Sequence, residues 1–152
     1  MSDIVQPSVR SRMMAGIRGK DTKPEMLVRR SLHAAGYRFR LHRRDLPGAP
    51  DIVLFGRKIA IFVHGCFWHR HSGCRYAKLP ATRADFWKDK LDSNVARDES
   101  AVDALTAAGW RVLIVWECST RDRELAPRLA TLLCEWMEGE ALTGEISSSI
   151  AG

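Results

Sequence analysis

Blocks of regularly spaced apolar residues predict the order of helices and strands along the chain. The first block begins near Lys23, where Asp21 and Thr22 are candidate caps and Pro24 suits a first turn, and it ends at Gly36. Its apolar positions recur at helical spacing. We therefore expect a helix between Lys23 and Gly36.

The next three blocks have the patterns of strands. YRFRL at residues 37–41 alternates apolar and basic residues, as a half-exposed strand does. DIVLF at residues 51–55 and IAIFVH at residues 59–64 are separated by Gly-Arg-Lys, which predicts a hairpin. Their apolar density indicates a central sheet covered by helices.

The second half of the chain predicts a helix, a strand and a helix. The pattern is helical from about Arg83 to Ala108, with a break near Ser93, and WRVLIVW at residues 110–116 predicts a buried strand. A last helix is expected over about residues 123–138. This order predicts a mixed α/β fold with one central β-sheet flanked by helices.

The two termini differ from this central block. Residues 1–20 are polar and basic and form a candidate N-terminal arm that orders on DNA; the alternative is a frayed terminus whose charges are solvated. Residues 140–152 are small and polar, which predicts a flexible tail. We expect a single domain over residues 21–139, long enough to bury a core without disulfides.

The charge balance favours an anionic partner. The chain has 24 Lys and Arg against 18 Asp and Glu, a net charge of +6, and a pI near 9.5. Such a balance fits nucleic acid without selecting it. The sequence has no apolar run of transmembrane length and no signal peptide, so we expect a cytoplasmic protein with no membrane partner.

A cluster of cysteines and histidines indicates a metal site. Cys66, His71 and Cys74 follow the strand at 59–64, and Cys118 follows the strand that ends at Trp116. Three thiolates and one imidazole match the softness of zinc and form a closed, structural set. The alternative is a group of thiols that bind no metal. Cys134, within an apolar helical pattern, is expected to lie in the core.

A second set of residues fits phosphodiester hydrolysis with a divalent metal. Asp51 opens a strand and offers a hard oxygen ligand, and a main-chain carbonyl near Val63 or His64 on the adjacent strand could complete the shell.

His69 is the candidate general base, because an imidazole can accept a proton near neutral pH. Asp98 or another carboxylate could orient it, and Glu25 could bind metal-bound water. Taken singly, each residue also fits a plain role as a cap, a turn residue or a solvated helix charge.

The chain resembles the very-short-patch repair (Vsr) DNA mismatch endonucleases over roughly residues 8–138. Five ordered motifs carry the resemblance: RSRMMAGIRGKDT, LPGAPDIVL, IFVHGCFWHRHSGC, PATRADFWKDKLDSNVARD and GWRVLIVWEC. It implies a PD-(D/E)XK nuclease-like (restriction-endonuclease-like) fold with the usual later acid and lysine replaced, a catalytic Mg²⁺ and a structural Zn²⁺. The strand at 59–64 carries no Glu-x-Lys pair, which agrees with that replacement.

The resemblance also implies a role for each matching residue. Asp51 and the carbonyl of Val63 would bind magnesium, and His69 would be the general base. The supporting residues would be Glu25, His64 and Asp98, and the zinc ligands would be Cys66, His71, Cys74 and Cys118. The chain departs from the family at Val63, where threonine is common, and in the interval before Cys74, which differs by one residue because of Ser72-Gly73.

The resemblance further implies that aromatic side chains wedge into the duplex beside a mismatch. Phe67, Trp68 and Trp87 are the candidates, and a mismatched step costs less to open than a matched one. The alternative is that these rings are core; we expect Phe67 and Trp68 to be exposed, because their loop is short. The remaining candidates for DNA contact are Met14, Arg12, Arg18, Lys20, Lys88 and Lys90.

The function that the resemblance implies is a nick 5′ to the mismatched T of a T:G pair, which starts very-short-patch repair after deamination of 5-methylcytosine. Its partners would be double-stranded DNA with that mismatch, mismatch-repair proteins and a cognate cytosine-5 methyltransferase, and the chain would be a monomer. Two alternatives stay open: a restriction-type endonuclease on matched DNA, and a zinc-stabilised DNA-binding module without catalysis.

Overall fold

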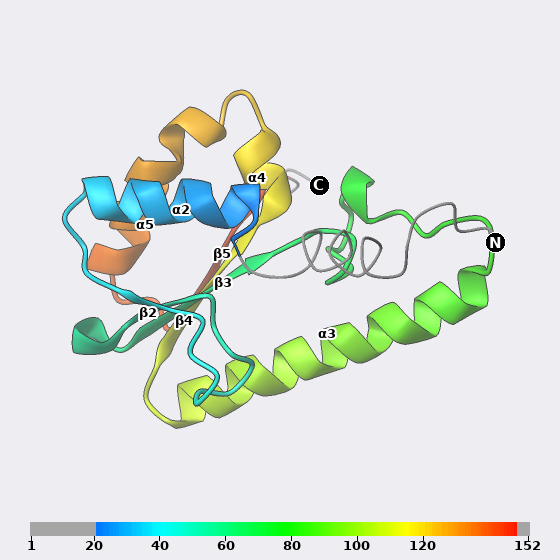
Figure 1. Cartoon of the computed structure of the whole chain (residues 1–152), viewed down its shortest axis with the longest axis horizontal. Helices are drawn as coiled ribbons and strands as arrows, with labels where there is room; N and C mark the ends of the chain where they lie inside the picture. The colour runs from blue at the N-terminus through cyan, green and yellow to red at the C-terminus, as the bar shows by residue number, and fades with distance from the viewer. Residues whose placement is uncertain (1–20, 149–152) are drawn as a thin grey trace, which may run out of the picture.

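The computed structural model describes residues 21–148 (Figure 1). Helices and strands alternate along the chain around one central sheet of five strands. In chain order the elements are α2 (Lys23–Ala34), β1 (Arg40–Leu41), β2 (Ile52–Leu54), η1 (Phe55–Arg57), β3 (Ile59–His64), η2 (Arg75–Ala77), α3 (Ala84–Ala107), β4 (Arg111–Trp116), α4 (Glu117–Arg121), η3 (Ala126–Arg128), α5 (Leu129–Glu138) and β5 (Thr143–Ile146).

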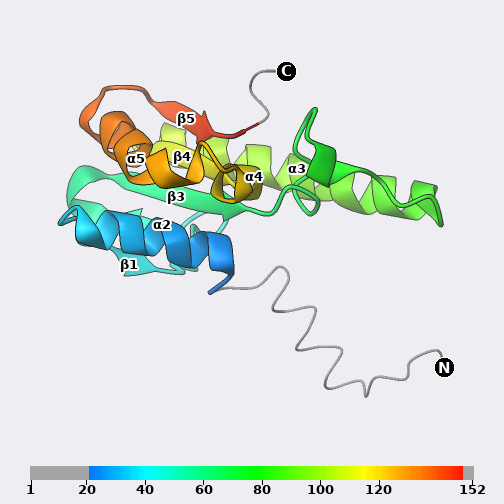
Figure 2. The same cartoon turned by 90° about the horizontal axis from the view of Figure 1, so that it is seen from above.

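The sheet is mixed, as the sequence predicts. Its five strands lie in the order β1-β2-β3-β4-β5; β1, β2 and β3 pair antiparallel, whereas β3, β4 and β5 pair parallel. Figure 2 shows α2 and α5 on one face of the sheet and α3 on the other. The mixed α/β architecture with a central sheet between helical layers is therefore confirmed.

Successive side chains of β3 point to opposite faces of the sheet and fill both apolar cores. Ile59 and Ile61 pack into the apolar core under α2 and α5. Ala60 and Phe62 pack with Leu105 of α3 on the opposite face. Because both faces of the strand are buried, it reads in the sequence as a continuous apolar run.

Helix α2 begins and ends where the sequence predicts. The side chain of Thr22 accepts a hydrogen bond from the main-chain N–H of Glu25, with Pro24 in the first turn. Gly36 adopts a φ of 88°, a left-handed conformation that glycine accepts readily and that ends the helix. This start places Glu25 in the first turn of the helix, where its side chain is buried.

Several predicted boundaries are wrong. Helix α3 is unbroken at Ser93, and the strand predicted at residues 37–41 is reduced to the two residues of β1. The last helix, predicted over 123–138, is divided into η3 and α5, because Pro127 lies within this segment and cannot donate a main-chain hydrogen bond. The short helix α4 precedes this segment and is not predicted from the sequence.

The predicted flexible tail is corrected over residues 143–148. Residues Thr143–Ile146 form β5, which pairs in parallel with β4, and Ile146 and Ser147 are buried. The segment is short and has few apolar residues, so composition conceals a strand that the neighbouring β4 stabilises. Among the described residues, no helix is long and apolar enough to cross a membrane.

Candidate functional site

Asp51 lies just before β2, with its carboxylate against the neighbouring strand. Its Oδ2 atom accepts a hydrogen bond of 2.7 Å from the main-chain N–H of Val63. Burial raises the pKa of Asp51 from 3.8 to about 6, against the lowering effect of that hydrogen bond. The negative charge of Glu25 raises the pKa further, and His42 and His69 lower it. These four groups are therefore close enough to act on one another electrostatically.

Glu25 presents a buried carboxylate to the same region. Its side chain is only 2% exposed, and its Oε2 atom lies 2.7 Å from Nε2 of His42 and 3.2 Å from the guanidinium of Arg29. The Oε1 atom accepts a hydrogen bond from the main-chain N–H of Asp21. A buried carboxylate held by several donors keeps a fixed orientation.

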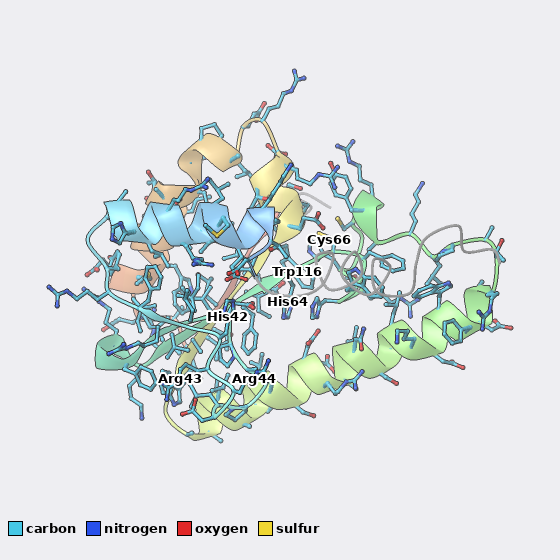
Figure 3. The ribbon with its side chains drawn as sticks, in the orientation of Figure 1. His42, Arg43, Arg44, His64, Cys66 and Trp116 are labelled. Atoms are coloured by element: carbon cyan, nitrogen blue, oxygen red, sulfur yellow. The ribbon has the colours of Figure 1, made fainter. Side chains whose placement is uncertain are left out.

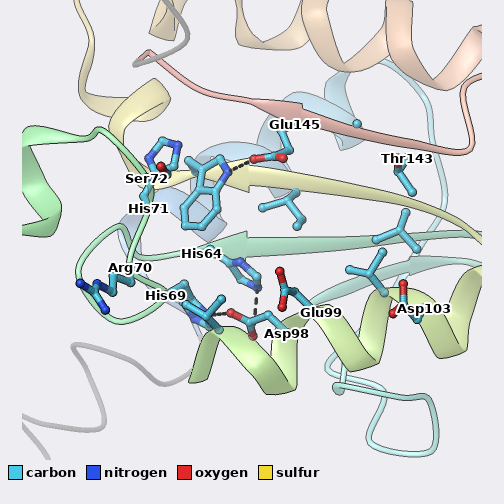
Figure 4. A pocket seen from close by; sticks show the side chains of 16 residues that line it. His64, His69, Arg70, His71, Ser72, Asp98, Glu99, Asp103, Thr143 and Glu145 are labelled. Atoms are coloured by element: carbon cyan, nitrogen blue, oxygen red, sulfur yellow. Dashed lines mark hydrogen bonds and ion pairs between the residues drawn. The ribbon is translucent and has the colours of Figure 1, made fainter. Parts of the chain in front are cut away.

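His69, His64 and Asp98 form a compact group between β3 and α3. Nδ1 of His69 lies 2.6 Å from Oδ2 of Asp98, so Asp98 is the carboxylate that orients this ring. The rings of His64 and His69 stack with their centroids 3.7 Å apart. Burial lowers the pKa of His64 well below its usual value, which keeps that ring neutral. The three sequence candidates are thus brought together (Figure 4).

Cavities lie on both sides of His69. One, of about 370 Å³, is lined by Val63, Trp68 and His69 together with residues of α2 and α4. The other, of about 650 Å³ and shown in Figure 4, is lined by His64, His69 and Asp98 and opens along α3 toward β4 and β5. The imidazole of His69 is therefore reachable from solvent while its Nδ1 atom is held by Asp98.

The four predicted zinc ligands converge in the structure. Cys66, His71, Cys74 and Cys118 are all buried, and their ligand atoms lie within 4.8 Å of one another. Figure 3 shows the region where β3 and β4 end, with His64, Cys66 and Trp116 labelled. Burial raises the pKa of the Cys66 thiol. A bound cation reverses that cost, because it favours the thiolate.

The donor set of this cluster fits a metal ion of borderline softness. Three sulfur atoms and one imidazole nitrogen match the tetrahedral sets that hold structural zinc. Main-chain N–H groups of Cys118 and Ser148 point at the sulfur atoms of Cys66 and Cys118, at 3.3 and 3.4 Å. Donors of this kind stabilise thiolates.

Ser147 is a residue that the sequence analysis missed. Its Oγ atom lies 3.1 Å from Nε2 of His71, while Nδ1 of the same ring faces the Cys118 sulfur at 3.6 Å. The hydroxyl therefore fixes the orientation of the histidine from outside the cluster. Nothing in the pattern around Ser147 signals this role, because it depends on the pairing of β5 with β4.

The aromatic candidates form one cluster, and one expectation about it is wrong. Phe67 contacts Trp68 and Trp87, with ring centroids 5.1 and 5.5 Å apart. Trp68 is 9% exposed, so it is buried rather than exposed, because Trp87 covers it. Phe67 and Trp87 are half-buried, and Phe86, 45% exposed, extends the cluster to the surface.

Two of the predicted basic DNA contacts, Lys88 and Lys90, lie within the described residues. Lys88 is exposed and forms an ion pair of 2.9 Å with Asp92, and Lys90 is half-exposed on α3. The other predicted DNA contacts, which are Arg12, Met14, Arg18 and Lys20, lie outside the described residues.

Comparison with known proteins decides the family. The sequence model described as "DNA mismatch endonuclease Vsr" matches residues 2–75. The DNA mismatch endonuclease Vsr of Escherichia coli (strain K12) is 41% identical over 150 residues, which are 97% of this chain and 96% of that protein. The chain belongs to the Vsr DNA mismatch endonuclease family. The resemblance stated from the sequence motifs is thereby confirmed, and with it the assignment of the chain to the endonucleases.

Two nicking enzymes are also similar to this chain over most of their length. The Type II nicking enzyme V.XorIIP of Xanthomonas oryzae pv. oryzae is 51% identical over 134 residues, 88% of this chain and 98% of that protein. The Type II nicking enzyme V.NmeAIP of Neisseria meningitidis serogroup A is 41% identical over 125 residues, 82% and 89% of the two chains.

Proposed function

We propose that this Vsr-family endonuclease nicks duplex DNA 5′ to the mismatched T of a T:G pair, in a magnesium-dependent hydrolysis, and so starts very-short-patch repair. The observation that supports this most is the convergence of Asp51, Glu25 and the His69–Asp98 pair where β2 begins and β3 ends. This arrangement combines a hard oxygen ligand with an oriented base, which phosphodiester hydrolysis needs.

In the proposed site, Asp51 and the main-chain carbonyl of Val63 would hold magnesium, which would polarise the phosphate and shield its developing charge. Asp51 suits this role because its carboxylate is buried with a raised pKa, so a bound cation would lower the cost of its charge. Glu25 is fixed by Arg29 and His42 and orients water at the same place.

His69 takes the proton from the attacking water in this proposal. With Nδ1–H donated to Asp98, its Nε2 atom carries the free lone pair that accepts a proton. The stacked His64 ring is neutral and adds no competing charge beside it. Zinc is held by the cluster of Cys66, His71, Cys74 and Cys118. The bound ion anchors the loop that contains His69, because one ligand, Cys118, lies at the end of β4.

A mixed sheet with the candidate carboxylate at the start of one strand supports a PD-(D/E)XK-like arrangement. Phe67, Trp87 and Phe86 form the surface proposed to press on the duplex, supported from beneath by Trp68. The proposed partners in the cell are a cognate cytosine-5 methyltransferase and mismatch-repair proteins.

A nicking assay on a panel of duplexes tests this proposal. Matched, T:G and other mismatched oligonucleotides are incubated with magnesium and with the wild-type, Asp51→Asn, His69→Ala and His33→Ala chains; His33 is an exposed residue in the last turn of α2 and serves as the control. We expect T:G duplexes to be nicked fastest and both site variants to lose about 100-fold or more.

Two outcomes contradict the proposal. Equal cleavage of matched and T:G duplexes would favour a restriction-type activity. Tight DNA binding with no magnesium-dependent cleavage by the wild-type chain would favour a zinc-stabilised binding module.

A further inference from the structure

We propose that His42 is a positioning residue that ties Glu25 to Asp51 within the nicking site. The inference rests on the proposed function, since it concerns the same two carboxylates. His42 lies directly after β1 and contacts both residues, Asp51 through its main chain and Glu25 through its ring. Its main-chain N–H donates a hydrogen bond of 2.9 Å to the carbonyl oxygen of Asp51, and its Nε2 atom lies 2.7 Å from Oε2 of Glu25.

The two carboxylates need such a link because they repel each other. The charge of Glu25 raises the pKa of Asp51, and His42 lowers it. Glu25 is nearly fully buried, so water cannot replace the donor that His42 supplies at its Oε2 atom, where Arg29 is the other donor. His42 therefore holds Glu25 at a fixed distance from the backbone of Asp51 and offsets part of the repulsion.

The backbone of His42 supports this role. Its φ of 49° is in the left-handed region, which is unfavourable for a residue with a Cβ atom. This conformation follows the pairing of Leu41 with Ile52 and allows the main-chain N–H to reach Asp51 while the ring reaches Glu25. Unfavourable conformations of this kind persist where the surrounding contacts hold them, often at functional sites.

A direct metal-binding role for His42 is less consistent with the charges. Asp21, Glu25 and His42 lie close enough to hold an ion. However, the guanidinium of Arg29 already bridges the carboxylates of Asp21 and Glu25, at distances of 2.7 and 3.2 Å. A cation would have to displace or lie beside this positive charge, so positioning through a hydrogen bond is the role that the geometry supports.

Two variants of the full-length chain separate positioning from general support of the fold. His42→Ala removes the donor, whereas His42→Gln keeps a side-chain N–H that can reach Glu25. His33→Ala is the matched control on α2. Single-turnover nicking of a T:G duplex is measured for each, with the KM for DNA, the magnesium concentration at half-maximal rate and the melting temperature.

We expect the nicking step of His42→Ala to be about 10–100-fold slower, the range typical for loss of a supporting contact. The KM for DNA should stay within about twofold, and His42→Gln should recover most of the rate. Equal loss in His42→Gln and His42→Ala, or no loss in His42→Ala, overturns the inference. The double variant Glu25→Gln/His42→Ala should be no slower than Glu25→Gln alone; additive losses also overturn it.

A measurement without catalysis distinguishes failure of this inference from failure of the proposed function. The ¹⁵N shifts of the His42 imidazole are recorded in the wild-type, Glu25→Gln and His33→Ala chains. We expect a change in Glu25→Gln and none in His33→Ala. If Asp51→Asn nicks at the wild-type rate, the proposed function fails even where the shift changes; if the shift does not change, the link between His42 and Glu25 is absent.

Discussion

Oδ2 of Asp98 lies 2.6 Å from Nδ1 of His69, although the two residues are 29 positions apart in the chain. The contact forms because α3 crosses the end of β3, where the loop carrying His69 begins. A carboxylate in this position fixes the imidazole tautomer that leaves Nε2 able to accept a proton.

Replacement of Asp98 by Asn should therefore slow nicking with little effect on binding. The amide keeps the shape of the side chain but can present its N–H to Nδ1 and reverse the tautomer of His69. We expect a loss of about 100-fold in the nicking rate, measured under single-turnover conditions on a T:G duplex. Asp103→Asn, an exposed acid further along α3, is the control. A rate for Asp98→Asn equal to that control would contradict the assigned role.

The charge of Asp51 should make stability depend on pH. Its pKa is raised from 3.8 to about 6, mainly by burial. Between these values the folded chain binds more protons than the unfolded chain, so the free energy of unfolding falls as pH rises from about 4 to about 6. Above pH 6 the full cost of the buried charge is present.

Asp51→Asn should consequently stabilise the chain in magnesium-free buffer. The gain is at most about 3 kcal/mol at pH 8 and much smaller at pH 4, as measured by urea unfolding at both values. Magnesium chloride should raise the stability of the wild-type chain more than that of the variant, because the ion binds the folded carboxylate. An equal gain at pH 4 and pH 8 would show that the charge of Asp51 is not its cause.

The Cys/His cluster should bind one zinc ion per chain and stabilise the fold. Cys118→Ser removes one of four ligands, so we expect loss of bound zinc, measured by elemental analysis, together with a lower melting temperature. Cys134→Ser is a matched control, because Cys134 is half-buried in α5 and outside the cluster. Equal zinc content in both variants would contradict the ligand assignment.

Two rings of the aromatic cluster should have different roles, because Trp68 is buried and Phe86 is exposed. Trp68 is buried beneath Trp87, and truncation to Ala should lower the free energy of unfolding by about 3 kcal/mol. Phe86 is exposed, so Phe86→Ala should change stability by less than about 0.5 kcal/mol. Its effect should appear in the ratio of T:G to matched nicking rates. A stability loss for Phe86→Ala as large as that for Trp68→Ala would reverse this assignment.

Local sequence patterns were sufficient to predict the helix and the strand that position the candidate site. The bounds of α2 and β3 follow from the Thr22 cap and from a continuous apolar run, and the cysteine and histidine spacing identified the four residues that the structure brings together. The contacts of His42 and Ser147 could not be predicted in this way. They join residues 17 and 76 positions apart, and only the packed sheet brings these together.

The C-terminal segment shows the same limit. Its composition predicts a tail, yet β5 covers the edge of β4, and Gly144 lies so close to the indole of Trp136 that a Cβ atom there would collide with it. A chain ending at Gly139 should thus lose about 3 kcal/mol or more of stability, because it exposes the edge of β4 and the surface that Ile146 buries. It should also bind zinc about 10-fold more weakly, since Ser147 no longer orients His71. A chain ending at Ser148 is the control and should match the full-length chain in urea unfolding and zinc titration. If the two truncated chains unfold at the same urea concentration, β5 contributes nothing to the fold, and the compositional interpretation of the segment as a tail is the better one.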